Sequence, residues 1–252
     1  MIKKISFIGS GNVATHLALA FQKVNIKIIQ IVSRNEKSGK LLAKHTNALF
    51  NSNIKNLLKT DLIIICVNDD SIASVAKQIP DLPIVHTSGN NSIKIFNDKI
   101  NAGVFYPLQT FSKETPIDFK TTPVCVEGNN SSFEKKIVRL AQKISNKVYS
   151  INSEKRKHLH LSAVIASNFS NFCYLIAKKQ LDSENLKFEL LKPLILETAK
   201  KIINTNPILT QTGPAKRGDK KVIKEHLKVL KDDNYKKIYK LLSENILKEY
   251  EK

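Results

Sequence analysis

The sequence predicts an α/β fold in which a mostly parallel sheet is followed by an all-α C-terminal domain. In the first 151 residues, short β-branched runs alternate with segments of helical periodicity, which is typical of βαβ units. Two of these runs, residues 28–32 and 62–67, are almost continuously apolar, as in strands that helices cover on both faces. After residue 153 no strand pattern occurs, and apolar residues recur at helical spacing.

Each element is expected from its own pattern. The strands are expected, in chain order, at residues 5–8, 26–32, 61–67, 83–86, 103–105, 124–126 and 147–151. Ser153 can cap a helix that begins with Glu154 and continues to Lys179. Further helices are expected at residues 188–204, 221–230 and 235–250. We therefore expect two domains, residues 1–152 and residues 153–252. Because a long helix without a sheet of its own often completes its burial against a second copy of the chain, we also expect a homodimer.

The composition is that of a globular protein of the cytoplasm. The chain has 252 residues, of which 42% are hydrophobic and 25% are charged. No apolar run approaches the length of a bilayer span, and the apolar stretch at residues 5–8 is too short for a signal peptide. The three cysteines are far apart and never spaced as CxxC, which argues against a disulfide framework or a zinc site. We expect no metal and no membrane partner.

The net charge of +19 raises the question of a nucleic-acid partner. Residues 1–152 carry a net charge of +10 and residues 153–252 a net charge of +9, so the excess is spread evenly and forms no basic tail. Lys, Asn and Ile are all abundant, which indicates a drift toward AT-rich codons. We therefore expect no nucleic-acid partner, although the excess charge can steer a phosphorylated ligand inward.

A strand, a glycine-rich turn and a helix follow one another at the N-terminus. Residues 5–8 form the strand, residues 9–14 (GSGNVA) the turn, and residues 12–23 have a helical apolar face. In a Rossmann-type domain, G-x-G-x-x-A in this context binds the pyrophosphate of a dinucleotide at the helix N-terminus. The alternative is an ordinary tight turn. The expected cofactor-binding residues of this turn are Gly9, Ser10, Gly11, Asn12 and Val13.

The end of the second strand indicates which dinucleotide binds. A carboxylate about 20 residues beyond the glycines would bind the ribose 2′-hydroxyl of NAD. Here Ser33 and Arg34 follow the strand, and the first acid is Glu36. Because a hydroxyl and a guanidinium suit a 2′-phosphate, we expect NADP rather than NAD. The alternative is that Arg34 only solvates a loop.

Two later loops are expected to border the cofactor, since ligands of open α/β sheets lie beyond the carboxyl ends of the strands. Val67 and Asn68 end the strand at 61–67 and would border the ribose or pyrophosphate. His86 and Ser88 follow the next strand and would lie near the nicotinamide, to which they offer hydrogen bonds. The acids at positions 69 and 70 are more simply explained as helix caps.

Several motifs occur in an order that resembles a known group of proteins. They are FIGSGNVA, VSRN, CVNDDSI, HTSGN, FYPLQTF, RKHLHLSAVIASNF and TGPAKRGD. Together they resemble the predicted short-subunit dehydrogenase-like oxidoreductases, in which a Rossmann-like NADP domain precedes a helical domain of unknown function. More distant relatives are pyrroline-5-carboxylate reductases, deazaflavin-dependent NADP reductases and β-hydroxyacid dehydrogenases. The resemblance covers nearly the whole chain and implies NADP-linked redox chemistry, but it does not specify a substrate.

The long helix departs from one of these relatives. β-Hydroxyacid dehydrogenases place a catalytic lysine four residues before an asparagine; here Asn168 matches the asparagine, but Val164 replaces the lysine. In a regular helix His160 and Asn168 lie near one face. We expect His160 to be the general acid or base, Asn168 to bind a substrate carbonyl or the carboxamide, and Ser88 to be the third catalytic residue. The alternative is that His160 is an interface histidine bonded to a backbone carbonyl.

The segment at residues 212–219 (TGPAKRGD) breaks the helical pattern of the C-terminal half. One interpretation is an anion-binding loop in which Thr212 and Arg217 bind the substrate. The other is a connector whose Asp219 caps the next helix and pairs with Arg217. The sequence leaves both open.

The sequence therefore predicts an NADP(H)-dependent oxidoreductase that transfers a hydride to or from a small carbonyl or imine metabolite. The alternative class is a non-catalytic NADP-binding redox sensor, which the missing lysine at position 164 favours.

Overall fold

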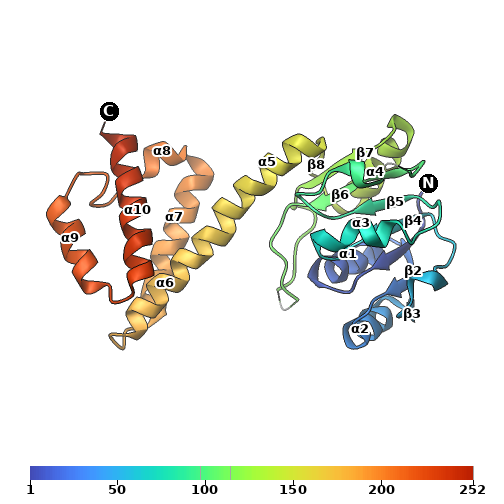
Figure 1. Cartoon of the computed structure of the whole chain (residues 1–252), viewed down its shortest axis with the longest axis horizontal. Helices are drawn as coiled ribbons and strands as arrows, with labels where there is room; N and C mark the ends of the chain where they lie inside the picture. The colour runs from blue at the N-terminus through green and yellow to red at the C-terminus, as the bar shows by residue number, and fades with distance from the viewer. Residues whose placement is uncertain (97, 114, 252) are drawn as a thin grey trace. The chain divides into compact units, whose positions relative to one another are not determined.

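The computed structural model describes residues 1–96, 98–113 and 115–251. The chain divides into two compact units, unit 1 (Met1–Ser167) and unit 2 (Asn168–Lys252) (Figure 1). Residue 153, where the sequence places the start of the second domain, is the first residue of helix α5 (Ser153–Ala163). Unit 1 continues beyond residue 153, to Ser167, because α5 packs against the sheet through Arg156 and Leu159.

Unit 1 is built on an eight-stranded sheet in the order β3-β2-β1-β4-β5-β6-β7-β8. All neighbouring strands are parallel except β6 and β7, which confirms the predicted mostly parallel, Rossmann-type sheet. The strands are β1 (Lys4–Ile8), β2 (Lys27–Val32), β3 (Leu49–Asn51), β4 (Leu62–Ile65), β5 (Ile84–His86), β6 (Ala102–Pro107), β7 (Val124–Gly128) and β8 (Val148–Ser150). The sequence did not predict β3, because a three-residue strand is too short to show a period.

Helices cover both faces of the sheet. On one face, α1 (Asn12–Lys23), α2 (Glu36–Thr46) and α4 (Ser131–Ile144) pack on strand residues such as Phe7 and Ile64. On the other, α3 (Ile72–Ala76) packs on Ile63 and Ile65. Because successive side chains of a strand point to opposite faces, the continuous apolar run of β4 supplies both cores. The strand order reverses between β1 and β4, so the crevice for a ligand lies at their carboxyl ends.

The helical run that begins at Ser153 is not a regular α-helix throughout. α5 passes into a π-helical segment, Val164–Phe169, and then into α6 (Ser170–Asp182). The expected cap is wrong by one residue: the side chain of Asn152 accepts the bond from the Lys155 amide, and Ser153 bonds elsewhere. The π segment also changes the angular spacing along the helix. The regular-helix argument that placed His160 and Asn168 near one face therefore does not hold for this chain.

Unit 2 is all-helical in its described residues, as the sequence predicts. Its elements after α6 are η5 (Phe188–Leu191), α7 (Lys192–Asn204), α8 (Pro207–Thr210), α9 (Lys220–Val229) and α10 (Asp233–Tyr250). Among the residues described here, only Ala215 and Ser243 are buried, whereas many large apolar side chains are exposed. Unit 2 thus has almost no core of its own.

One helical run in the described chain, Ser153–Asp182, is long and apolar enough to cross a membrane by length and composition alone. The helix has this average composition although polar residues interrupt it, so the sequence contains no uninterrupted apolar run of that length. A single helix of this kind is weak evidence for a membrane span, because helices that pack against protein have the same composition.

Candidate cofactor and active site

The two glycines after β1 have different structural roles. Gly9 has φ +107°, and a Cβ there would lie 2.1 Å from the carbonyl oxygen of Cys66, the residue that follows β4. Gly11 has an ordinary extended backbone and precedes α1, and nothing lies within 4 Å of the Cβ that it lacks. Gly9 therefore makes the turn possible, and Gly11 leaves open space at the helix N-terminus, the part of a Rossmann-type domain to which a pyrophosphate is suited.

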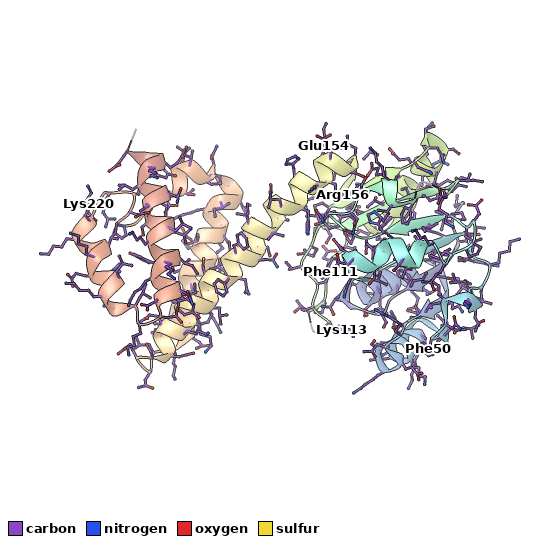
Figure 2. The ribbon with its side chains drawn as sticks, viewed as in Figure 1. Phe50, Phe111, Lys113, Glu154, Arg156 and Lys220 are labelled. Carbon is purple, nitrogen blue, oxygen red and sulfur yellow. The ribbon has the colours of Figure 1, made fainter. Side chains whose placement is uncertain are left out.

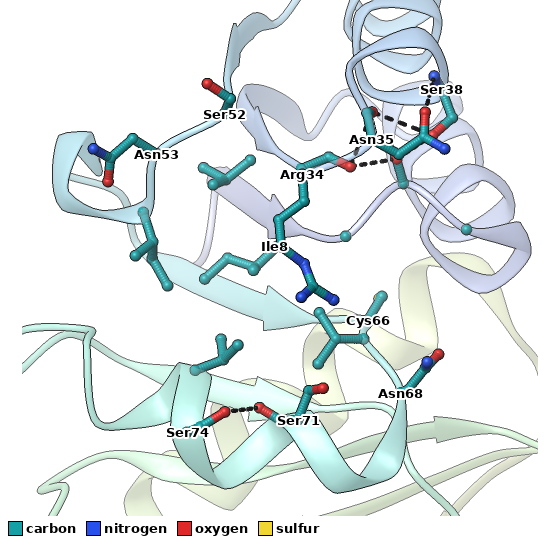
Figure 3. Close-up of a pocket in the computed structure, with 18 of the residues that line it drawn as sticks. Ile8, Arg34, Asn35, Ser38, Ser52, Asn53, Cys66, Asn68, Ser71 and Ser74 are labelled. Carbon is teal, nitrogen blue, oxygen red and sulfur yellow. Dashed lines mark hydrogen bonds between the residues drawn. The ribbon is translucent and has the colours of Figure 1, made fainter.

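A cavity of about 1240 Å³ opens at the carboxyl ends of β1, β2 and β4. Its lining includes most of the predicted cofactor residues: Gly9, Ser10, Gly11, Asn12, Ser33, Arg34, Val67 and Asn68. Of the described lining residues, Arg34 and Lys113 are cationic and none is acidic. Figure 3 shows the Arg34 side chain extending into the cavity, with Ser38 on one side and Ser71 and Ser74 on the other. The cavity therefore favours a polyanionic ligand.

Three serine hydroxyls meet beside Arg34. The Oγ of Ser10 lies 2.7 Å from the Oγ of Ser33 and 2.7 Å from that of Ser38. Asn35 caps α2 by accepting a bond from the Ser38 amide at 3.1 Å. Hydroxyls and a helix N-terminus next to a guanidinium suit a phosphate group. Ser38 and Asn35 are not among the residues predicted from the sequence, although the N-cap pattern before α2 could have identified them.

The loop between β6 and β7 crosses the start of α1. The side chain of Asn12 donates to the carbonyl of Phe111 at 2.7 Å, and Nε2 of His16 lies 2.7 Å from the carbonyl of Ser112. These bonds bring Lys113 to the rim of the cavity; Figure 2 labels it near Phe111. No sequence signal identifies Lys113, because its placement depends on this loop alone.

A second cavity, of about 560 Å³, continues from the first and shares Gly11, Val67 and Asn68 with it. Val13 and Ser88 also line it. The Oγ of Ser88 donates to Oδ2 of Asp69 at 2.8 Å and accepts bonds from the amides of Asn90 and Asn91. Asp69 therefore anchors the Ser88 loop instead of capping a helix, contrary to the sequence expectation. Ser88 has one hydroxyl hydrogen, and the bond to Asp69 uses it.

The structure does not bring His86 to either cavity. Its side chain is fully buried, and its Nδ1 accepts a bond from the Ser88 amide at 3.1 Å. Burial and the nearby Arg156 guanidinium lower the pKa of His86 to about 3, so the ring is neutral. In this position His86 shapes the loop that carries Ser88.

His160 lies against two residues from different parts of unit 1. Its Nδ1 is 3.1 Å from the hydroxyl of Tyr106 at the end of β6. A Cβ on Gly89, the residue after Ser88, would lie 2.7 Å from the His160 ring and 2.8 Å from that of Tyr106. The structure thus brings His160 next to the loop that lines the second cavity. The partner is a side-chain hydroxyl and not the backbone carbonyl of the alternative interpretation.

Asn168, Thr212 and Arg217 belong to unit 2, and all three are exposed. Arg217 pairs with Asp219, with its Nε 2.9 Å and its Nη2 2.8 Å from Oδ2. Asp219 precedes α9 but accepts no capping bond. The Arg217–Asp219 ion pair that the connector interpretation predicts is therefore present, but the predicted cap by Asp219 is absent.

No group of three or more potential metal ligands occurs in the part of the chain that the structure describes.

Comparisons with known proteins agree with this geometry. Residues 4–86 match the family described as NADP oxidoreductase coenzyme F420-dependent, and residues 122–246 match a domain of unknown function, DUF2520. A proposed NADP oxidoreductase from Bacteroides fragilis is 36% identical, with a TM-score of 0.92 over 98% of both chains. The chain belongs to this NADP oxidoreductase family. Its cofactor is NADP, and the more specific short-subunit dehydrogenase-like group is not confirmed.

Further solved structures share the fold of this NADP oxidoreductase. A Thermotoga maritima protein is 25% identical over 98% of both chains, with a TM-score of 0.74. A reductive aminase from Aspergillus terreus, solved with NADPH and ethyl-5-oxohexanoate, is 14% identical over 99% of this chain and 95% of its own, with a TM-score of 0.73. Curated proteins give no match.

Proposed function

We propose that this NADP oxidoreductase transfers a hydride to or from a small carbonyl or imine compound, with His160 as the proton donor or acceptor. The observation that carries the proposal is the position of His160, whose ring contacts Gly89 beside the second cavity and whose Nδ1 is held by Tyr106. The reductive aminase of the same fold, solved with a keto ester, is an analogy in support.

The cofactor and the side chains of the protein would have separate roles in the reaction. NADPH, when bound, supplies a hydride from its nicotinamide ring. The turn at Gly9–Val13, the Ser33 hydroxyl and the Arg34 guanidinium would hold the cofactor, with Val67 and Asn68 beside it. Addition of a hydride to C=O or C=N requires one proton at the oxygen or nitrogen, and protonated His160 would donate it. Asn168 would bind the substrate carbonyl or the carboxamide.

We also propose Ser88 as a catalytic residue, and Thr212 and Arg217 as substrate-binding residues. A catalytic role for Ser88 requires its hydrogen to leave Asp69. Likewise, Thr212 and Arg217 would bind an anionic substrate group only if Arg217 exchanged its Asp219 partner for that group.

The direct test is NADPH consumption with a panel of small ketones, oxo acids and cyclic imines. We expect at least one member to be reduced, and His160→Gln to lower that rate by about 10²–10⁴-fold. His158→Gln is the matched control, because His158 is exposed on the same helix and the Tyr106 hydroxyl bonds to His160 instead. An equal loss in both variants would contradict the role of His160.

A second candidate is a non-catalytic NADP-dependent sensor. Val164 favours it, because no lysine is available there for the proton relay of the β-hydroxyacid dehydrogenases. NADPH binding without turnover of any compound in the panel would support the sensor and overturn the reductase.

We also propose that the chain is a homodimer in which unit 2 is covered by a second copy. Apart from Ala215 and Ser243, no described residue of unit 2 is buried, while Leu194 and Ile203 are 63% and 81% exposed. The apolar surface buried within unit 2 is too small to offset the conformational entropy lost on folding. A second copy of the chain offers equally apolar faces. Light scattering should give twice 28.4 kDa, and Leu194→Asp should weaken the assembly. A stable monomer would contradict this proposal.

A further inference from the structure

The hydroxyl of Tyr106 is placed to control the ring of His160. Tyr106 lies at the carboxyl end of β6 and its side chain is 9% exposed. The two rings meet edge to face, with centroids 5.9 Å apart and an interplanar angle of 81°. Nδ1 of His160 is the hydrogen-bond partner of the hydroxyl in the described chain, at 3.1 Å.

We propose that Tyr106 is a positioning residue, which holds Nδ1 of His160 and thereby makes Nε2 the nitrogen that exchanges a proton with the substrate. This inference rests on the proposed role of His160 and adds to it the atom that carries the proton and the residue that selects that atom.

In this proposal the hydrogen bond runs from Nδ1 of His160 to the oxygen of Tyr106. Burial raises the pKa of Tyr106 to about 12, so the phenol keeps its hydrogen at neutral pH. The phenol oxygen can therefore accept the Nδ1–H of His160 when the ring is protonated, and it still accepts it after Nε2 has lost its proton. The contact persists in both charge states, so the ring does not need to turn during a proton transfer.

The proton balance of the reductive direction is then simple. Protonated His160 loses the Nε2 proton to the oxygen or nitrogen of the substrate as the N–H···O bond forms and the N–H bond breaks. It keeps its Nδ1 hydrogen, bonded to Tyr106. Solvent restores the proton at Nε2 before the next cycle.

Gly89 provides the second constraint on the same ring. Its missing side chain leaves room for His160, since a Cβ would lie 2.7 Å from Cγ and Nδ1 of the imidazole. Gly89→Ala should therefore displace the His160 ring from Tyr106 without removing the Tyr106 hydroxyl. Charged or titratable groups of other elements near the pair are Asp69, Cys125 and Arg156. None of them is changed in the variants proposed below.

The test measures directly which nitrogen of the His160 imidazole carries the hydrogen. Nitrogen NMR of ¹⁵N-histidine-labelled protein with NADP⁺ bound distinguishes the two neutral tautomers, and His160→Gln identifies which of the six histidines gives the signal. We expect the hydrogen on Nδ1 in the wild type, and a mixture of tautomers in both Tyr106→Phe and Gly89→Ala. Tyr149→Phe, at an exposed tyrosine of β8, should leave the signal unchanged.

Kinetics complete the test. Tyr106→Phe should lower kcat by about tenfold and shift the pH profile of kcat/KM, with little change in the KM for NADPH. An unchanged tautomer and an unchanged pH profile in both variants would overturn the inference. If the tautomer responds as expected but no panel compound is turned over, the positioning pair stands and the reductase proposal fails.

Discussion

Arg156 on α5 and Glu127 on β7 form an ion pair whose guanidinium is completely buried. The same guanidinium donates to the carbonyl of Asn91, and Glu127 also accepts a bond from Ser153 at 2.7 Å. Figure 2 labels Arg156 near the start of α5, beside the sheet. The pair thus ties the start of α5, which carries His160, to the sheet and to the loop that carries Ser88.

Removing one partner of this pair should destabilise the protein severely. Arg156→Met leaves the Glu127 carboxylate without its countercharge in a nearly buried site, and we expect a loss of about 3–5 kcal/mol in the free energy of unfolding. Urea titration of the NADP-free protein measures it. Lys155→Met, at an exposed neighbour, should change stability by less than about 0.5 kcal/mol. A loss of the same small size for Arg156→Met would contradict the structural role of the pair.

Arg34 should determine the preference between the two nicotinamide cofactors. Arg34→Asp removes a charge-assisted bond to the 2′-phosphate and adds a repulsive charge, so we expect NADPH affinity to fall by about 10–100-fold. NADH lacks this phosphate, and its affinity should change little. Calorimetry with both nucleotides measures the difference. Lys37→Asp is the control, because it makes the same charge change at an exposed position outside the cavity lining. Equal effects on NADPH and NADH would refute the assignment of Arg34.

The two glycines of the first turn should respond differently to alanine. Gly9→Ala forces a Cβ against the Cys66 carbonyl at positive φ, and we expect it to cost about 1–3 kcal/mol of stability or more. Gly11→Ala meets open space and an ordinary backbone, so the fold should be unaffected. The added methyl group would instead occupy space near the pyrophosphate and weaken NADP binding by at least about tenfold. Thermal melts with and without NADP⁺ separate the two effects. The reverse pattern would contradict this reading of the turn.

His86 should contribute to acid sensitivity. Its pKa is lowered from 6.5 to about 3 in the folded protein, so between these values the unfolded chain binds a proton that the folded chain does not. Its contribution to stability is complete above pH 6.5 and is lost as the pH falls toward about 3, with a slope of up to about 1.4 kcal/mol per pH unit.

Urea unfolding across this pH range, compared between the wild type and His86→Gln, isolates that slope. We expect a shallower decline of stability with falling pH in the variant, whatever its absolute stability. Parallel curves would show that His86 is not the neutral, buried group described here.

Much of the nucleotide site could be predicted from the sequence because it is local. Strand, turn and helix follow one another without a break around Gly9 and Gly11, and Arg34 directly follows β2. The strand order of a Rossmann-type sheet then brings these segments together. Here sequence proximity and the general rules of the fold were sufficient.

The catalytic side was harder to predict, because it depends on contacts between distant segments. Tyr106 and His160 are 54 residues apart, and the tyrosine lies in a motif that gave no chemical signal. The sequence indicates a helix cap at Asp69, because its true partner, Ser88, is 19 residues away. The π segment at Val164–Phe169 has no sequence signature, and only the backbone shows it.

Binding of nicotinamide nucleotides to the purified wild-type chain tests the central claim most directly. Titration calorimetry should give one NADPH per chain, and at least about tenfold weaker binding of NADH. Uptake of neither nucleotide by the correctly folded protein, or tighter binding of NADH, would contradict the account.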